Sequence, residues 1–318
     1  MTVLIVAPET DEHGLAVAAE IARQGGQPQT LDLESFPEHV ALSMRYDCCG
    51  GRRDFTMARR SGSLAFADVG SVWWRRPQPA RIASAITRSS HRQFAANEAQ
   101  EALAGLWYAL DASWINEPAR DETAARKAYQ LKIAQEIGFA IPATLMTNDP
   151  DAVRLFVDAR GYRNVVYKSF SSTHEEWRET RLLKTEELAL IDNVRYSPVI
   201  FQEYVEADVD LRITVVDDSI FPAAIHSQQT AYKVDCRIDI GNALIESTTL
   251  PADLEEKIMS LMRRLGLVYG AIDMRLTPDG RYVFLEINPA GQWLYIEQAT
   301  RQPISSRLAK ALVEADRH

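Results

Sequence analysis

Three side chains with oxygen ligands lie near the end of the chain at the spacing of a metal site. Glu286 and Asn288 are two residues apart in an apolar run that predicts a strand, so both side chains leave the same face. Asp273 lies about as far before the turn at 278–280 as Glu286 lies after it, and a hairpin would bring all three together. Two carboxylates and an amide suit Mg²⁺. The alternative is a solvated strand face, which fits less well because a lone carboxylate in an apolar run is costly.

Two lysines have the surroundings expected of a triphosphate clamp. Lys168 ends the predicted strand at 165–168 and precedes a loop of small residues, 169–172. Lys127 lies in a predicted helix. Either lysine alone is more often a solvated surface residue. The prediction therefore depends on the two occurring together with Asp273, Glu286 and Asn288, which we call the acidic set.

An apolar strand that carries one carboxylate indicates a nucleotide-binding hinge. The segment consists of Phe201, Gln202, Glu203, Tyr204 and Val205. Backbone groups there would bind the adenine edge, and Glu203 would hold the amino group or the ribose. An ordinary strand end explains the segment equally well when it is taken alone.

Three aspartates are each followed two residues later by an arginine: Asp210 and Arg212, Asp235 and Arg237, and Asp273 and Arg275. On strands each pair shares a face, so each aspartate could orient its arginine. Arginine suits carboxylate and phosphate oxygens and can stabilise a transferring phosphoryl group. The alternative is that these are ordinary cross-strand ion pairs. With a metal site nearby, we expect a cationic pocket in which Arg212 and Arg237 receive the carboxylate of an anionic substrate or its acyl phosphate.

The elements that must position these residues begin with a β–α–β unit. A β-branched strand at 3–6, a helical stretch at 14–24 and a strand at 30–33 indicate a parallel sheet. Apolar spacing predicts helices over 92–112 and 121–137, the second ending at Gly138. We place a domain boundary near residue 118.

The remainder alternates strands with short helices. We predict strands at 199–205, 210–216, 220–227, 237–239, 271–276 and 282–287, and a helix at 252–265. Runs of strands interrupted by helices favour an α+β fold after the α/β opening. The expected domains are residues 1–118, 119–205 and 206–318.

Composition excludes several classes of function. A net charge of −9 argues against non-specific nucleic-acid binding. No apolar run reaches the roughly 20 residues that a membrane helix needs, and the N-terminus predicts a buried strand rather than a signal peptide. Cys48, Cys49 and Cys236 lack metal-type spacing, which indicates reduced thiols in the cytoplasm.

The order of these motifs resembles the ATP-grasp superfamily, and more closely its microviridin-type peptide ligases, which make graspetides. The resemblance covers almost the whole chain. It rests on the segments 72–77, 210–216, 224–228, 234–237 and 286–293. One departure is Cys236, where such ligases often have an aromatic residue between the aspartate and the arginine.

The resemblance implies an N-terminal α/β domain, a central domain and a C-terminal ATP-grasp domain, with ATP between the last two. It implies Lys127 and Lys168 on phosphates, Glu203 and Val205 near adenosine, and Mg²⁺ on the acidic set. The reaction implied is phosphorylation of an Asp or Glu side chain in a precursor peptide. A Ser/Thr hydroxyl or a Lys amine then captures the acyl phosphate and closes a ring.

Two rival hypotheses remain open. One is an ATP-grasp ligase of a free amino acid or small metabolite, and the other is an ATP-binding regulatory protein without turnover. The complete acidic set argues against the second. We also expect a precursor peptide with a leader as partner, no nucleic acid, no membrane, and a homodimer.

Overall fold

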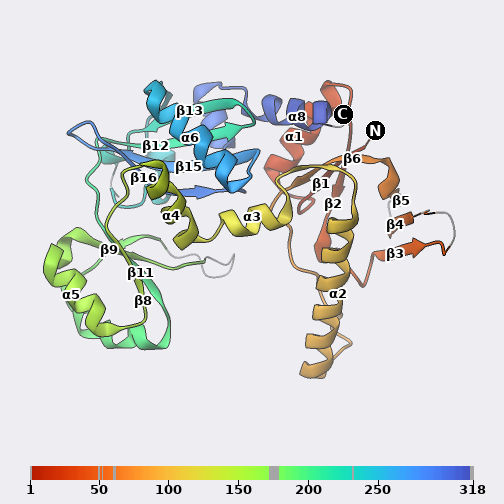
Figure 1. The fold of residues 1–318 in the computed structure, drawn as a ribbon, viewed down its shortest axis with the longest axis horizontal. Helices are drawn as coiled ribbons and strands as arrows, with labels where there is room; N and C mark the ends of the chain where they lie inside the picture. The colour runs from red at the N-terminus through yellow and green to blue at the C-terminus, as the bar shows by residue number, and fades with distance from the viewer. Residues whose placement is uncertain are drawn as a thin grey trace.

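A computed structural model describes residues 2–48, 51, 53–59, 62–171, 179–230 and 233–315, with the backbone alone for Cys236. Its strands form a parallel N-terminal sheet, a three-stranded meander, a central sheet and a C-terminal sheet (Figure 1). Cys49 and the side chain of Cys236 lie outside the described part, so the expectation of reduced thiols stays a prediction. No described helix is both long and apolar enough to cross a membrane.

The N-terminal sheet has the order β2–β1–β6–β7, with every pair parallel. Its strands are β1 (Thr2–Val6), β2 (Gln27–Leu31), β6 (Val69–Trp74) and β7 (Ser113–Ile115). Leu4 and Val6 pack on the face that meets the meander β3 (Ala41–Tyr46), β4 (Arg53–Arg59) and β5 (Gly62–Ala65), and helix α2 (Ser89–Ala109). Val3 and Ile5 pack on the opposite face with helix α1 (Glu12–Arg23). Alternate residues of one strand therefore serve two cores.

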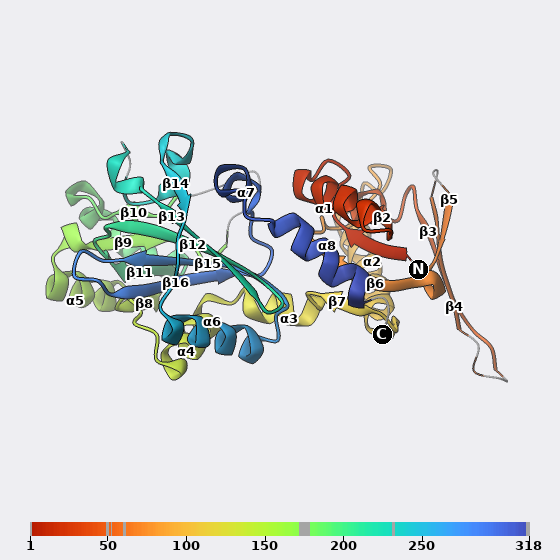
Figure 2. The same cartoon turned by 90° about the horizontal axis from the view of Figure 1, so that it is seen from above.

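The central sheet has the order β10–β9–β11–β8, and its pairs are antiparallel. Its strands are β8 (Thr144–Thr147), β9 (Val165–Lys168), β10 (Arg181–Leu182) and β11 (Val199–Glu203). Helix α5 (Pro150–Arg160) and the 3₁₀ segment Thr185–Tyr196 cover one face with a small core of their own. The opposite face of the central sheet lies toward the C-terminal sheet (Figure 2).

The C-terminal sheet is antiparallel, in the order β14–β13–β12–β15–β16. Its strands are β12 (Val209–Val216), β13 (Ser219–Ile225), β14 (Ile245–Ser247), β15 (Tyr269–Leu276) and β16 (Tyr282–Asn288). Helices α3 (Pro118–Ala124), α4 (Lys127–Ile137) and α6 (Ala252–Leu265) bury one face of it. Helices α3 and α4 thus share a core with the C-terminal sheet, whereas the boundaries at 118 and 205 stay predictions.

The last helices join the two ends of the chain. Helix α7 (Leu294–Thr300) follows β16, and α8 (Ile304–Ala315) lies beside α1 and β6 of the N-terminal sheet (Figure 2). Leu308 and Leu312 of α8 are fully buried in one cluster with Val3 and Ile21. The C-terminal helix therefore completes the N-terminal core.

Three elements differ from the sequence prediction. The single helix expected at 121–137 is two helices, broken at Ala125 and Arg126, although its end at Gly138 in a left-handed conformation (φ 94°) is confirmed. The first helix ends at the break because the side chain of Gln130 donates to the carbonyl of Ala124 at 2.6 Å. The strand expected at 237–239 is wrong, because Asp235 accepts from the backbone N–H of Arg237 and starts a 3₁₀ turn there. The helix expected over 92–112 begins and ends three residues earlier.

Candidate functional site

The acidic set lies on adjacent strands of the C-terminal sheet. Asp273 on β15 is directly opposite Glu286 on β16, and Asn288 follows opposite Ala271. The intervening Ile272 and Ile287 point into the core beneath, so the three polar side chains leave the other face. The convergence expected from the sequence is thereby confirmed as geometry.

Two ammonium groups meet this set from other elements. Lys127 is the first residue of α4, and its Nζ lies 2.7 Å from Glu286 Oε2. Lys168 is the last residue of β9, and the charges of Glu286 and Asp273 act on it. Burial would raise the pKa of Glu286, but Lys127 and Lys168 outweigh burial and lower that pKa to about 2. Glu286 is therefore ionised at neutral pH.

The neighbouring aspartate has a different balance. Burial raises the pKa of Asp273, and the opposing attraction of Arg212 does not cancel that shift. Arg212 donates from Nη1 to Asp273 Oδ1 at 2.7 Å and from Nη2 to the carbonyl of Gln292 at 2.8 Å. Arg212, Asp273 and Glu286 form a row across β12, β15 and β16.

The set of oxygen atoms suits a hard cation such as Mg²⁺. Each carboxylate has one oxygen held by a cation, and within the described ranges its second oxygen accepts no hydrogen bond. Asn288 Oδ1 accepts from the backbone N–H of Ala290 at 3.0 Å, which orients the amide. No group of three or more His, Cys, Asp or Glu side chains is assembled among the described residues. A cation here would thus take two carboxylates and an amide and complete its shell with water and phosphate.

Gln130 of α4 fixes the strand that carries the ligands. Because β16 is at the edge of its sheet, the outward backbone groups of Ile287 lack a partner strand. Gln130 Nε2 donates to Ile287 O at 2.7 Å, and Gln130 Oε1 accepts from Ile287 N at 3.2 Å. Sequence reasoning missed this residue, whose only signal is a polar side chain on the buried face of a helix.

The predicted nucleotide hinge borders a pocket of about 340 Å³. Glu203, Tyr204 and Val205 line it together with residues 140–142, 277–279, 281 and 283. This volume is in the range of small-molecule sites. Gln202 differs from its neighbours, because it is buried and donates to Thr144 Oγ1 at 2.9 Å, within the central sheet.

Two of the three predicted Asp–x–Arg pairs do not form within one strand. Their members form ion pairs across neighbouring strands instead. Asp210 is opposite Arg275 and Arg212 is opposite Asp273, so the partners are exchanged. Arg275 Nε lies 2.8 Å from Asp210 Oδ1, and both side chains are buried. Asp210 also accepts from Ser227 Oγ. Asp210 and Arg275 therefore form an internal pair.

The third pairing is confirmed on a turn rather than on a strand. Asp235 accepts from Arg237 Nε at 2.7 Å and from Nη2 at 2.5 Å, and also from Thr180 N at 3.1 Å. Half of the Arg237 side chain stays exposed. Hydrogen bonds to Asp235, and after them the charges of Glu286 and Asp273, raise the pKa of Arg237. Asp235 therefore holds the guanidinium group of Arg237 through Nε and Nη2, while half of the side chain is exposed.

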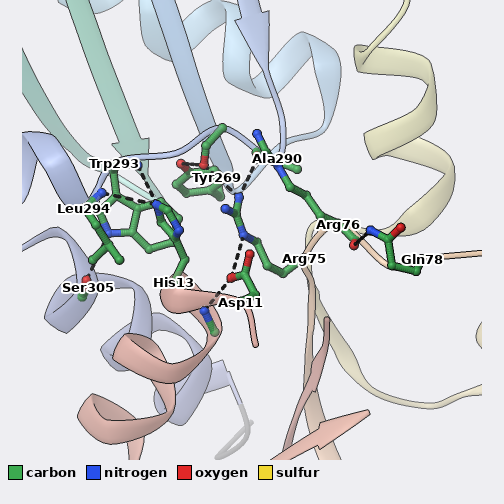
Figure 3. A network of polar contacts seen from close by, with 12 residues as sticks. Asp11, His13, Arg75, Arg76, Gln78, Tyr269, Ala290, Trp293, Leu294 and Ser305 are labelled. Atoms are coloured by element: carbon green, nitrogen blue, oxygen red, sulfur yellow. Dashed lines mark hydrogen bonds and ion pairs between the residues drawn. The ribbon is translucent and has the colours of Figure 1, made fainter. Parts of the chain in front are cut away.

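The loop after β16 is held by side chains from the N-terminal part of the chain (Figure 3). Arg75 Nη1 donates to the carbonyls of Ala290 (2.5 Å) and Gly291 (2.9 Å), and Arg76 Nε donates to Ala290 at 2.8 Å. His13 Nε2 accepts from the backbone N–H groups of Trp293 and Leu294, at 3.1 and 3.3 Å. Asn116 donates to the carbonyls of Tyr269 and Pro289.

Gly291 lets this loop lie close against the sheet, where a larger residue would not fit. A Cβ there would lie 2.3 Å from the Cβ of Ala271 and 2.8 Å from Arg212 Nη2.

His13, which holds the same loop, is neutral, because burial, and then Arg75, lower the pKa of His13 to about 3. Among these residues the sequence offered a signal only for Arg75 and Arg76, two cations that end an apolar strand.

Comparisons with known proteins agree with this geometry. Residues 2–122 match the MvdD pre-ATP-grasp domain, and residues 124–312 match the RimK-like ATP-grasp domain. The chain is similar to the macrocyclase MdnC of Microcystis aeruginosa MRC, solved with its precursor peptide MdnA. Their identity is 32%, the TM-score is 0.88, and 99% of this chain and 100% of that one are covered.

Two further structures are similar over nearly the whole chain. A RiPP-associated ATP-grasp ligase of Chryseobacterium gregarium, in complex with ADP and a leader and core peptide, shares 29% identity at a TM-score of 0.88, covering 98% of this chain and 96% of that one. The ATP-grasp ligase PsnB, with minimal precursor, Mg and ADP, has the same fold at 21% identity and a TM-score of 0.77, covering 99% and 97%. No match was found among curated proteins.

The family matches cover both parts of the chain, and the MdnC likeness covers all but a few residues. Enzymes of this family are ligases that bind ATP or ADP together with Mg²⁺. The chain belongs to the RimK-like ATP-grasp ligases, in the microviridin-type group that carries a pre-ATP-grasp domain.

Proposed function

We propose that this ligase closes rings in a ribosomally made precursor peptide. An Asp or Glu side chain of the peptide attacks the γ-phosphate of ATP and becomes an acyl phosphate, releasing ADP. A Ser/Thr hydroxyl or a Lys amine then attacks the acyl carbon, phosphate leaves, and an ester or amide remains. The peptide loses one water for each ring closed.

The observation that carries this proposal is the convergence of charges at one point. Asp273 and Glu286 face each other across two strands, with Lys127, Lys168, Arg212 and Arg237 around them. Two anionic reactants must meet in such a reaction, so the site needs cations to offset their repulsion. The likeness to ligases solved with precursor peptides supports a peptide as the acceptor.

Each residue has a proposed role. The hinge, with Glu203, Tyr204 and Val205, holds adenosine in the 340 Å³ pocket. Lys127 and Lys168 hold the phosphates. Asp273, Glu286 and Asn288 would hold Mg²⁺, which would supply positive charge to the phosphate oxygens.

Arg237 is proposed to receive the peptide carboxylate or its acyl phosphate, because its side chain is half exposed and Asp235 orients its guanidinium group. Arg212 adds positive potential beneath the site. The buried Gln202, Asp210 and Arg275 are proposed to position these groups without touching substrate.

The test is ligation with ATP, Mg²⁺ and a precursor candidate, encoded by a short neighbouring reading frame rich in Thr, Asp and Glu. Loss of water from the peptide, read by mass spectrometry and dependent on both ATP and Mg²⁺, is the expected result. The Arg237→Lys variant should cut ring closure severely, with ATP binding and melting temperature nearly unchanged, because lysine lacks the planar fork. Wild-type ring closure in this variant would refute the role of Arg237.

The same assay separates the rivals. ATP turnover with free amino acids but not with peptide would favour a small-molecule ligase, and ATP binding without turnover would favour a regulatory protein. Assembly as a homodimer stays a prediction that light scattering can test.

A further inference from the structure

One buried arginine joins two parts of the site that the sequence keeps far apart. Arg275 Nη1 donates to the carbonyl of Val205 at 2.6 Å, and its Nη2 donates to the carbonyls of Lys233 and Val234 at 3.1 and 3.0 Å. Its Nε donates to Asp210 at 2.8 Å. All three nitrogen atoms of the guanidinium are thus engaged, by acceptors on three segments.

The first of these segments is the nucleotide hinge. Tyr204 and Val205 line the 340 Å³ pocket, and the Tyr204 ring lies 5.3 Å from the guanidinium carbon of Arg275. We call residues 203–205 the hinge. A purine that packs against the hinge would restrict the motion of the backbone to which Arg275 is hydrogen-bonded.

The second segment leads directly to the arginine that is proposed to receive the peptide. Lys233 and Val234 immediately precede Asp235, whose carboxylate holds Arg237. Gln228 Nε2 also donates to the Lys233 carbonyl, at 3.2 Å. We call residues 233–238 the acceptor loop. Within the described residues, Arg275 is the side chain that contacts both the hinge and the acceptor loop.

We propose that Arg275 is a positioning residue through which bound nucleotide orders the acceptor loop, so that nucleotide and peptide favour each other's binding. The inference rests on the proposed function. Ordering one end of a bonded network lowers the entropy cost of ordering the other end, which produces coupling between two sites. Such coupling favours a site in which the groups that hold the peptide carboxylate are in place when it is activated.

Arginine is needed for this connection because of its shape. Its fork reaches four acceptors on three segments at once, whereas lysine carries the same charge on a single nitrogen. Arg275→Lys therefore leaves the electrostatic field nearly unchanged and breaks the connection. Arg307→Lys is the matched control, since Arg307 also bridges several acceptors, Asp217, Asp218 and Ser219, at a turn outside the site.

The experiment is amide hydrogen exchange of the full chain with and without Mg·ADP. In the wild type and in Arg307→Lys, Mg·ADP should slow exchange in both the hinge and the acceptor loop, the latter on the order of fivefold or more. In Arg275→Lys at saturating Mg·ADP, the hinge should stay protected and the acceptor loop should lose its protection. If Arg275→Lys does not fold, Asp210→Asn, which weakens the same junction, should reduce the protection of the loop.

The outcomes separate the two proposals. Equal protection of the acceptor loop in wild type and in the folded Arg275 or Asp210 variant would overturn the role of Arg275 while leaving the ATP site intact. Protection of the hinge without the acceptor loop in the wild type would do the same. No protection of the hinge in the wild type would instead refute the placement of adenosine, and this inference with it.

Discussion

At the scale of single residues, the surroundings of each charge decide its state. Glu286 has the ammonium groups of Lys127 and Lys168 near it, whereas Asp273 has the guanidinium groups of Arg212 and Arg237 and the negative charge of Glu286. Burial disfavours the ionised form of both carboxyl groups, and only at Glu286 do the neighbouring cations outweigh it. The two carboxyl groups of one site therefore have opposite pKa shifts.

Glu286→Gln should abolish ligation and leave the fold intact. The amide keeps the shape but removes the negative charge that a divalent cation needs. The measurement is ring closure against Mg²⁺ concentration, together with a melting curve. Glu256→Gln, on the exposed face of α6, is the control and should behave as wild type. Full turnover of Glu286→Gln at ordinary Mg²⁺ would remove Glu286 from the metal site.

Lys168→Met should weaken nucleotide binding by about 1–3 kcal/mol, the cost of losing a charge-assisted contact. Burial lowers the pKa of Lys168 in the free protein. Phosphates favour the charged ammonium, so binding should raise that pKa again. In the pH range between the two pKa values, nucleotide binding should take up protons.

Calorimetry in buffers of different ionisation enthalpy measures this uptake. It should be present in the wild type and absent in Lys168→Met. Lys132→Met, an exposed lysine of α4, should retain both the affinity and the uptake. Unchanged affinity in Lys168→Met would show that the ammonium does not contact the nucleotide.

The sequence predicted those residues whose partners are close along the chain or across one tight turn. Asp273, Glu286 and Asn288 were found because strand period and the turn at 278–280 determine their relative placement. The exchange of partners between Asp210 and Arg275 was missed, because β12 and β15 are neighbours in the sheet but distant in sequence. His13 lies about 280 residues from its partners, and no local pattern indicates such a contact.

At the scale of elements, the break between α3 and α4 has a function in the packing. It lets Lys127 start a helix at the acidic set and lets Gln130 face both Ala124 and the edge of β16. The apolar period alone continues through the break, which is why the sequence predicted one helix. The polar contacts of Gln130, which the spacing of apolar residues does not reveal, determine where the helix is broken.

Asp121 of α3 should make stability depend on pH. Its Oδ2 is buried and has no hydrogen-bond partner among the described residues, and burial raises the pKa of Asp121 to about 7 against the opposing effect of Arg75 and Arg76. An aspartate in the unfolded chain titrates near pH 4. Between roughly pH 4 and pH 7 the native state holds a proton that the unfolded state has lost, so this contribution to stability is lost as pH rises through the window.

Asp121→Asn cannot titrate, so it should be more stable than wild type at pH 8 and close to it at pH 4. The difference is on the order of a few kcal/mol, at about 1.4 kcal/mol for each pKa unit. Urea unfolding at the two pH values measures it. Asp111→Asn, with an exposed side chain paired to Arg53, should show no such difference. Parallel pH profiles for wild type and Asp121→Asn would contradict the prediction.

At the scale of the whole molecule, the N-terminal part supports β16, the strand that carries two of the proposed metal ligands. Arg75, Arg76 and His13 bind the backbone of the segment 290–294, close after Asn288 (Figure 3). Asn116 binds the carbonyl of Pro289. The orientation of the Asn288 amide depends on the N–H of Ala290, whose carbonyl these arginines hold. The support therefore reaches the proposed metal site within two residues.

Arg75→Met should destabilise the protein by about 1–3 kcal/mol, because two carbonyls lose a charged hydrogen-bond donor. The carbonyl of Ala290 would keep Arg76, and that of Gly291 would keep the hydroxyl of Tyr269. We also expect a higher Mg²⁺ requirement for nucleotide binding. Thermal unfolding and Mg²⁺ titration measure the two effects.

Arg81→Met is the control, because the Arg81 side chain is exposed and pairs only with Glu34 on the surface. Equal melting temperatures and Mg²⁺ requirements in the two variants would show that the junction supports neither stability nor the site.

The place of α8 has a consequence for engineering hybrid ligases. A crossover near residue 118, the predicted domain boundary, would separate the N-terminal sheet from the helix that fills its core. Leu308 and Leu312 of that helix pack beside Val3 and Ile21. A chimera that joins the first 118 residues of one ligase to the remainder of another would therefore pair a foreign helix with this surface. Chimeras should fold more often when residues 304–315 come from the same parent as the N-terminal sheet than when they come from the other parent.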